Sequence, residues 1–175
     1  MKWYVLLTAV VSLSFLTGCL GLFHTDTEVI DGGTRHYVDE EAPKTIQSTK
    51  IVSFSCEFTA TDIPMNESPI AGRYYTLYAA EYGGSFESRG GGEVFGQREF
   101  TPDADFFDAL QQIVSQYDFA QFNGQHYTVS GLPPDHGAKL EIRYDSGESI
   151  RASDNQSCFI PLEAMEELVE LFYPN

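Results

Sequence analysis

A β-hairpin near the C-terminus constrains the fold of this chain more than any other stretch of its sequence. From residue 139 to 144, charged and apolar side chains alternate, as in a strand that buries one face. The next three residues, Asp-Ser-Gly, fit a three-residue hairpin loop with the glycine in the left-handed conformation. The register that follows gives the pairs Tyr144–Glu148, Ile142–Ile150 and Glu141–Arg151. One face of this register is apolar and the other carries an ion pair, so it predicts an antiparallel hairpin packed on a core.

Other segments show strand patterns of the same kind. Between residues 50 and 59, Val52, Phe54, Cys56 and Phe58 alternate with polar side chains, which indicates a half-buried strand with these four side chains pointing inward. Further strands are predicted at 72–82, 85–89, 93–98 and 126–130. The stretch 131–137 contains two successive prolines and is predicted to be a rigid loop.

Two helices are predicted from capping residues and spacing. Thr101 is a good N-cap, with Pro102 and Asp103 suited to a first turn. The residues that then repeat at helical spacing, to a helix end near Asp118, are Phe106, Leu110, Ile113 and Tyr117, with Val114 beside them. A second helix starts at Pro161. Its apolar stripe is Met165, Leu168, Val169 and Phe172. The order of elements predicts an α+β fold, an antiparallel sheet with two helices packed on one face.

The charge of the chain excludes some partners. Among 175 residues, 26 are acidic and 10 are basic, which gives a formal net charge of −16. Binding nucleic acid requires clustered Lys and Arg, so a nucleic-acid partner is not expected. A basic patch that docks on an anionic bilayer is not expected either. No cofactor is implied by any motif.

The first nineteen residues resemble the signal peptide of a bacterial lipoprotein. Lys2 precedes an apolar run from Trp3 to Leu16, which is too short for a comfortable membrane span and fits a secretory signal. The run ends in Leu16-Thr17-Gly18-Cys19, which resembles a lipobox. The resemblance implies that Cys19 is lipidated, that residues 1–18 are removed, and that the protein is anchored on the extracytoplasmic side of the cell membrane. Alternatives are an ordinary signal peptide with an accidental cysteine, or an N-terminal membrane anchor.

The mature chain would then have 157 residues, since 18 are lost from 175, and a net charge of −17. Residues 19–48 are polar and largely unpatterned, and we expect a lipidated N-terminus and flexible tether there, with a short strand near 36–38. Residues 49–175 are expected to form a single domain.

Two cysteines remain, Cys56 and Cys158. Export favours oxidation, so they are a candidate disulfide that would close a loop of roughly 100 residues. The alternative is two buried free thiols, because cysteine is among the most frequently buried residue types. Catalysis by Cys56 is disfavoured, because the strand pattern points it inward.

The strongest candidate for a ligand-binding face is rich in tyrosine. Tyr74, Tyr78 and Tyr82 would share one face of a strand, with Arg73 adjacent. Tyrosine combines apolar area with a polar tip, which suits contact with a sugar or a peptide. The alternative is that helices cover this face.

Other motifs are weak, and neither a metal site nor a catalytic site is predicted. The series Asp103, Asp105 and Asp108 lacks the glycine and the final glutamate of a calcium loop. His126 and His136 are too few for zinc. Scattered acids that a hydrolase could use are Glu57, Glu81 and Asp135.

The stretch 131–172 also resembles small uncharacterised domains in exported proteins of clostridial-type bacteria. The residues that carry this resemblance are Gly-Leu-Pro-Pro-Asp at 131–135, Tyr-Asp-Ser-Gly-Glu at 144–148 and Asp-Asn-Gln at 154–156. It implies no catalytic residue or ligand. The sequence therefore predicts a membrane-anchored, non-enzymatic binding or interaction module with a protein, peptide or glycan partner. A cell-envelope hydrolase acting on wall polymers or peptides is the alternative.

Overall fold

The computed structural model describes residues 27–31, 33–130 and 137–174. Within these residues the chain forms a nine-stranded sheet, two α-helices and a short 3-10 helix. The strands are β1 (Thr27–Asp31), β2 (Thr34–Val38), β3 (Ile51–Thr59), β4 (Tyr74–Ala80), β5 (Gly83–Gly90), β6 (Glu93–Phe100), β7 (Gln125–Val129), β8 (Ala138–Tyr144) and β9 (Ser149–Asp154). The helices are α1 (Ala104–Gln116), η1 (Phe119–Phe122) and α2 (Leu162–Phe172).

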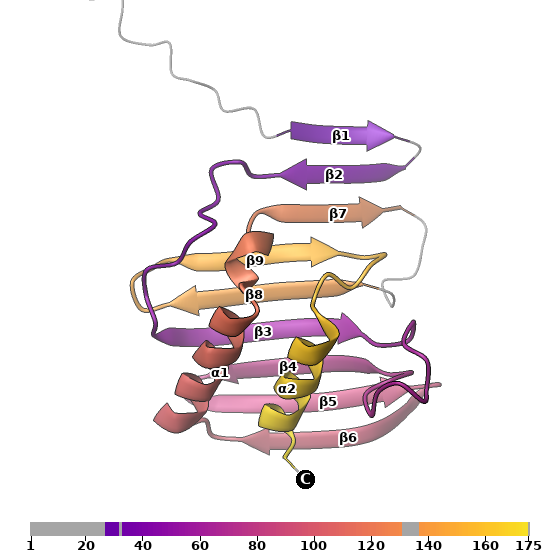
Figure 1. The fold of residues 1–175 in the computed structure, drawn as a ribbon, viewed down its shortest axis with the longest axis vertical. Helices are drawn as coiled ribbons and strands as arrows, with labels where there is room; N and C mark the ends of the chain where they lie inside the picture. Colours follow the sequence, from indigo (N-terminus) through magenta and orange to yellow (C-terminus); the bar gives the residue numbers. More distant parts are fainter. Residues whose placement is uncertain (1–26, 32, 131–136, 175) are drawn as a thin grey trace, which may run out of the picture.

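The strands lie in the order β1-β2-β7-β9-β8-β3-β4-β5-β6 (Figure 1). All neighbouring pairs are antiparallel except β7 and β9, which are parallel. The expectation of a mixed α and β fold with a mostly antiparallel sheet is confirmed. The sheet is larger than expected, and its parallel pair was not predicted. That pair is short, with only His126–Ser153 and Tyr127–Asp154 in register.

The predicted hairpin is confirmed with its register. β8 and β9 pair Ile142 with Ile150 and Glu141 with Arg151, and the amide of Tyr144 donates to the carbonyl of Glu148 at 3.0 Å. The left-handed conformation expected in the loop is present at Gly147, whose φ is 88°. The apolar pair is buried and the charged pair lies on the opposite face.

The N-cap of helix α1 lies two residues later than predicted. Asp103, and not Thr101, is the N-cap, because its Oδ1 accepts a hydrogen bond of 2.9 Å from the amide of Phe106. This carboxylate satisfies one of the free amides of the first turn and complements the helix dipole. The inward face of α1 is the predicted one, with Leu110, Ile113 and Val114 buried.

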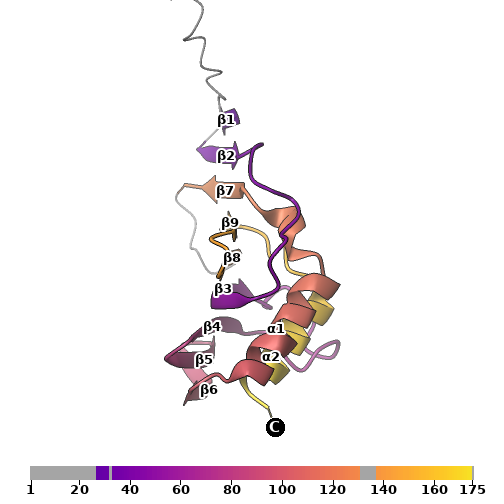
Figure 2. The same cartoon turned by 90° about the vertical axis from the view of Figure 1, so that its left-hand side faces the viewer.

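Helix α2 follows Pro161 as predicted and contacts α1. Met165, Leu168 and Phe172 are buried, and Ala164 is buried beside them. In the two views of the ribbon, α1 and α2 lie side by side across the strands (Figures 1 and 2). One apolar cluster joins the buried residues of both helices to those of β3, β4, β8 and β9. This cluster is the core, and burial of its apolar area drives folding.

The segment expected to be a flexible tether is partly structured. β1 and β2 form a hairpin, and β2 also pairs with β7 along its whole length. Residues 39–48 then hydrogen-bond to the rest of the domain, for example from the amide of Asp39 to the carbonyl of Gly124 at 2.9 Å. Strands and loops that are held mainly by main-chain hydrogen bonds need little alternation of apolar residues. The sequence pattern therefore does not reveal β1, the full extent of β2 or the contacts of residues 39–48.

Candidate functional site

The central strands carry two different faces. In β3, the buried Phe54, Cys56 and Phe58 alternate with partly exposed polar side chains. Val52, predicted to point inward with them, is instead 39% exposed, because the pairing with β8 shifts between Ile51 and Ser53. The cross-strand registers continue this alternation on the neighbouring strands. We call the polar side of these strands the open face. Its side chains are Ser53, Ser55 and Glu57 on β3, Tyr74, Thr76 and Tyr78 on β4, Ser85, Glu87 and Arg89 on β5, Lys139, Glu141 and Arg143 on β8, and Ser149, Arg151 and Ser153 on β9.

Two of the predicted tyrosines lie on the open face. Tyr78 is 43% exposed and pairs with Ser55 on one side and Ser85 on the other. Tyr74 is half-buried, and its hydroxyl donates to Oε2 of Glu57 at 2.6 Å. The ring of Tyr78 therefore presents apolar area between serine hydroxyls, which is an arrangement that can bind a polar ligand.

Tyr82, the third of the predicted tyrosines, lies beyond the end of β4. It lies in the two-residue turn between β4 and β5 and is 87% exposed. A hydrogen bond to the neighbouring Glu81 raises the pKa of its hydroxyl. Tyr82 can thus contact a ligand that reaches past the edge of the open face.

Arg73 lies elsewhere. Its guanidinium carbon is 4.7 Å from the centre of the Phe95 ring, a cation–π contact. Arg73 also lines a cavity of about 200 Å³ next to α2, together with Tyr75 and Glu166. Residues two apart in an extended chain point to the same side, so Arg73 shares the side of the buried Tyr75. Arg73 therefore does not join Tyr74 and Tyr78 on the open face.

Basic side chains, which the predicted ligand-binding face did not include, also lie on the open face. Arg143 and Arg151 flank Glu141, and Arg89 pairs with Glu87. The polar positions of the predicted hairpin contained this signal, because alternation places Lys139, Glu141 and Arg143 on a single face. The acidic and basic groups of the open face are therefore nearly balanced in number.

The two α-helices, unlike the open face, carry acidic residues without basic ones. Neither α1 nor α2 contains a Lys or an Arg. Their acidic residues, with the N-cap of α1, are Asp103, Asp105, Asp108, Glu163, Glu166, Glu167 and Glu170. The helices therefore carry seven of the 26 acidic residues and no basic residue, whereas the nearly balanced open face is accessible to ligands that acidic surfaces would repel.

A shallow hollow marks one end of the open face. It has a volume of about 240 Å³ and is lined by Glu57, Tyr74, Lys139 and Ser153, among others. It joins β3, β4, β8 and β9, which are neighbours in the sheet but distant in the sequence. The hollow offers a carboxylate, a phenol, an ammonium and a hydroxyl, a set that suits hydrogen bonding to a polar ligand.

The predicted hydrolase acids do not form a pair. Glu57 lies opposite Thr76 on β4, and Glu81 follows that strand five residues later. A strand rises about 3.3 Å per residue, so the two carboxylates are separated by roughly 15 Å along the strand. Glycosidases place their two carboxyl groups within about 10 Å of each other. Asp135 lies outside the described residues.

The histidine pair is only partly described. Nδ1 of His126 lies 2.9 Å from the hydroxyl of Ser153, and burial lowers the pKa of His126. His136 lies outside the described residues. Among the residues that the structure does describe, no group of three His, Cys, Asp or Glu side chains could hold a metal ion.

Cys56 and Cys158 are free thiols in the structure. Cys56 is buried in β3, and burial raises its pKa well above the ordinary value. Cys158 is partly buried between β9 and α2, with its sulfur 3.6 Å from Sδ of Met165, and burial raises its pKa too. Both thiols are therefore poor nucleophiles at neutral pH. Cys19, the predicted lipidation site, lies outside the described residues.

Comparison with models of protein families, with curated proteins and with solved structures finds no match to the chain. No helix among the described residues is long and apolar enough to cross a bilayer.

Proposed function

We propose that this protein is a lipid-anchored, extracytoplasmic binding module without catalytic activity, and that its open face binds the glycan of the cell wall. The anchor in this proposal is the diacylglyceryl group on Cys19 that the resemblance of Leu16–Cys19 to a lipobox implies. Two or more acyl chains provide stable membrane attachment, whereas a single chain is marginal.

The observation that carries the proposal is the composition of the open face. Tyr78 exposes a large aromatic side chain there, among rows of Ser, Thr, Glu and Arg side chains, and Tyr82 exposes another in the turn that follows β4. Sugars present both hydroxyl groups and C–H surfaces, so they match a face with hydrogen-bonding groups and aromatic rings. The strands also display these groups in adjacent rows, which suits contact with an extended polymer.

We further propose that the two helices cover one face of the sheet and leave the open face free. Both views of the ribbon support this, because α1 and α2 lie on the same side of the strands (Figures 1 and 2). The contact between the helices and their shared core with β3, β4 and β8 supports it as well.

The distribution of charge supports an orientation for the anchored module. The acidic helices would be repelled by anionic lipid headgroups, within the Debye length of about 10 Å at moderate salt. The nearly balanced open face carries little net charge and has no comparable repulsion. A module tethered at its N-terminus can then turn the open face toward the wall.

Co-sedimentation with purified, insoluble peptidoglycan tests this function. The full chain, kept soluble in detergent micelles, is expected to pellet with the polymer in a saturable manner and to be released by soluble glycan strands. The heat-unfolded chain is the control for non-specific trapping. Recovery of the native chain in the supernatant at every polymer concentration would contradict the proposal.

A further inference from the structure

A strap of residues 43–48 crosses the molecule between the first two strands and β3. The strap is fixed at its C-terminal end, where the amides of Gln47 and Ser48 each donate a 2.9 Å hydrogen bond to the carboxylate of Glu148. At its N-terminal end, Nδ2 of Asn123 donates to the carbonyl of Pro43 at 3.0 Å. Both ends of the strap are therefore held against the β8–β9 hairpin and the segment after α1.

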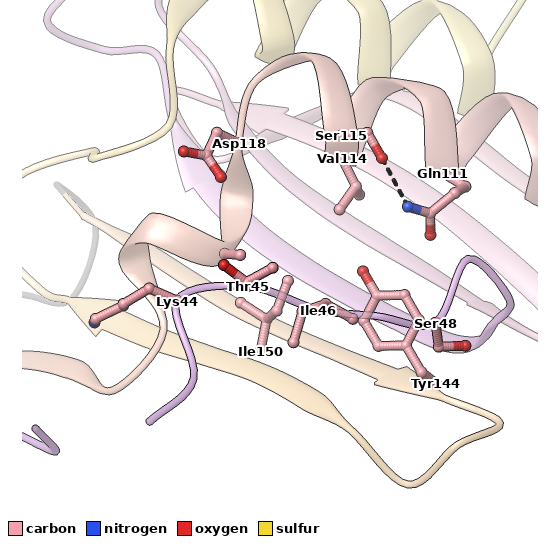
Figure 3. A pocket seen from close by; sticks show the side chains of 11 residues that line it. Lys44, Thr45, Ile46, Ser48, Gln111, Val114, Ser115, Asp118, Tyr144 and Ile150 are labelled. Carbon is pink, nitrogen blue, oxygen red and sulfur yellow. Dashed lines mark hydrogen bonds between the residues drawn. The ribbon is translucent and has the colours of Figure 1, made fainter. Parts of the chain in front are cut away.

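A pocket of about 170 Å³ lies between this strap, α1 and the β8–β9 hairpin (Figure 3). Gln111, Val114 and Ser115 line it from α1, and Tyr144 and Ile150 line it from the hairpin. Ile46 of the strap contributes an apolar side chain. Three elements that are far apart in the sequence thus form the walls.

Gln111 brings an unsatisfied polar atom to this pocket. Its Nε2 donates to the hydroxyl of Ser115 at 2.8 Å (Figure 3). Its Oε1 is buried without a hydrogen-bond donor from the described part of the chain, and the Gln111 side chain also interacts with the phenol of Tyr144. A buried acceptor without a donor destabilises a protein, so Oε1 of Gln111 can accept a hydrogen bond from water or from a ligand in the pocket.

Tyr144 adds a hydroxyl group on the opposite wall. Figure 3 shows this hydroxyl directed toward α1, on the side where Gln111 lies. The residue is buried, and burial raises the pKa of its phenol to about 12. The phenol is therefore protonated at physiological pH and can donate a hydrogen bond. Asp118, at the rim, has a φ of 47°, in the left-handed region that is costly for a residue other than glycine.

The chemistry of the walls limits the ligand. The groups that line the interior are an amide, hydroxyls and the apolar side chains of Ile46, Val114 and Ile150, with no formal charge among them. The charged side chains, Lys44 and Asp118, belong to exposed residues. A buried ion would be unpaired there and costly, whereas a hydrocarbon would leave Gln111 unsatisfied.

We propose that this pocket binds a small, uncharged polyhydroxy molecule of about the size of one monosaccharide. A hydroxyl of the ligand donates to Oε1 of Gln111, another accepts from the phenol of Tyr144, and the C–H groups contact Ile46, Val114 and Ile150. This pocket is separate from the open face, so the proposal does not depend on binding of the wall polymer.

Nuclear magnetic resonance titration of the ¹⁵N-labelled full chain in micelles tests the proposal, with glycerol, D-glucose and N-acetyl-D-glucosamine as probes and sodium acetate as a charged control. We expect saturable shifts of the amides of Ile46, Ser115 and Ile150 with at least one of the three polyhydroxy probes, and none with acetate. The absence of saturable shifts with all three probes, or equal shifts with acetate, would overturn the proposal.

A matched pair of variants distinguishes the site from an empty packing defect. Gln111→Leu keeps the size of the side chain and removes the acceptor, and we expect it to weaken binding at least about tenfold, the loss of one hydrogen bond. Gln112→Leu, at the adjacent exposed position of α1, is expected to bind like the parent chain. Undiminished binding by a folded Gln111→Leu would overturn the assignment of Gln111.

Discussion

Oε1 of Glu141 on β8 lies 3.5 Å from Nη2 of Arg151, its cross-strand partner on β9. The same oxygen is 2.6 Å from Nη2 of Arg143, two residues along β8. Hydrogen bonding by Arg143, together with the positive charges of both arginines, holds the pKa of the Glu141 carboxyl below its usual range. A single carboxylate thus joins two basic side chains on the open face.

The first prediction concerns the pH dependence of this cluster. Because the pKa of Glu141 is lower in the folded state, its stabilisation is complete above the unfolded pKa of about 4.3 and is lost as the pH falls through the folded value. Glu141→Gln is therefore expected to lower the free energy of unfolding at pH 7 by up to about 1 kcal/mol, as for other surface ion pairs. Urea unfolding at pH 7 and pH 3 measures the difference, which we expect to shrink at pH 3. Glu93→Gln, at an exposed position of β6, is the control, and a difference that stayed constant across this range would contradict the assignment.

The second prediction concerns a buried amide that joins three segments. The side chain of Asn123 donates to the carbonyls of Pro43 and Ser149 and accepts from the amide of Arg151, and the residue is only 4% exposed. Asn123→Ala leaves these groups without their partner, so we expect a loss of about 2–4 kcal/mol in the free energy of unfolding. Chemical denaturation measures it, with Gln121→Ala at an exposed site as the control. A loss no larger than that of the control would show that the amide is dispensable.

The third prediction concerns the two thiols. Since burial raises both pKa values, iodoacetamide at pH 8 is expected to modify Cys56 and Cys158 much more slowly in the native chain than in the unfolded chain. Cys158, which is partly exposed, should react before Cys56. Peptide mass mapping follows both sites. A disulfide-linked Cys56–Cys158 peptide in a non-reduced digest would instead support the oxidised alternative that export favours.

The fourth prediction concerns the anchor. In a bacterial host that processes lipoproteins, the parent chain is expected to incorporate radioactive palmitate and to partition into the detergent phase. Cys19→Ala is expected to lose both properties, whereas Cys56→Ala keeps the label, because it leaves the lipobox intact. If the parent chain remained unlabelled in such a host, the lipoprotein assignment would be wrong.

Local sequence patterns predicted the elements that have one apolar face. Both faces of the β8–β9 hairpin specify its register, because the same register pairs Ile142 with Ile150 and Glu141 with Arg151. The inward residues of α1 and α2 were predicted for the same reason. The N-cap of α1 was misplaced because Thr101 and Asp103 both have suitable side chains, and only the geometry of the turn selects Asp103.

Features that depend on contacts distant in sequence could not be predicted. The sequence of β2 shows only weak alternation of polar and apolar residues, and its pairing with β7 depends on main-chain hydrogen bonds. Arg73 was grouped with the tyrosines because it is adjacent to Tyr74, although adjacent residues of a strand point to opposite faces. The pocket beneath the strap joins Ile46, Gln111 and Tyr144, a combination that only the folded chain brings together.

The open face is the central claim, and the binding of peptidoglycan by a tyrosine variant tests it most directly. Tyr78→Ser with Tyr82→Ser removes both exposed rings, and such surface changes are expected to alter stability by less than about 1 kcal/mol. The control is Met65→Ser, at a side chain that is 76% exposed in the loop between β3 and β4. We predict that the double variant loses at least about tenfold in affinity for insoluble peptidoglycan while the control is unchanged. Equal binding by the parent chain and a folded double variant would contradict the account.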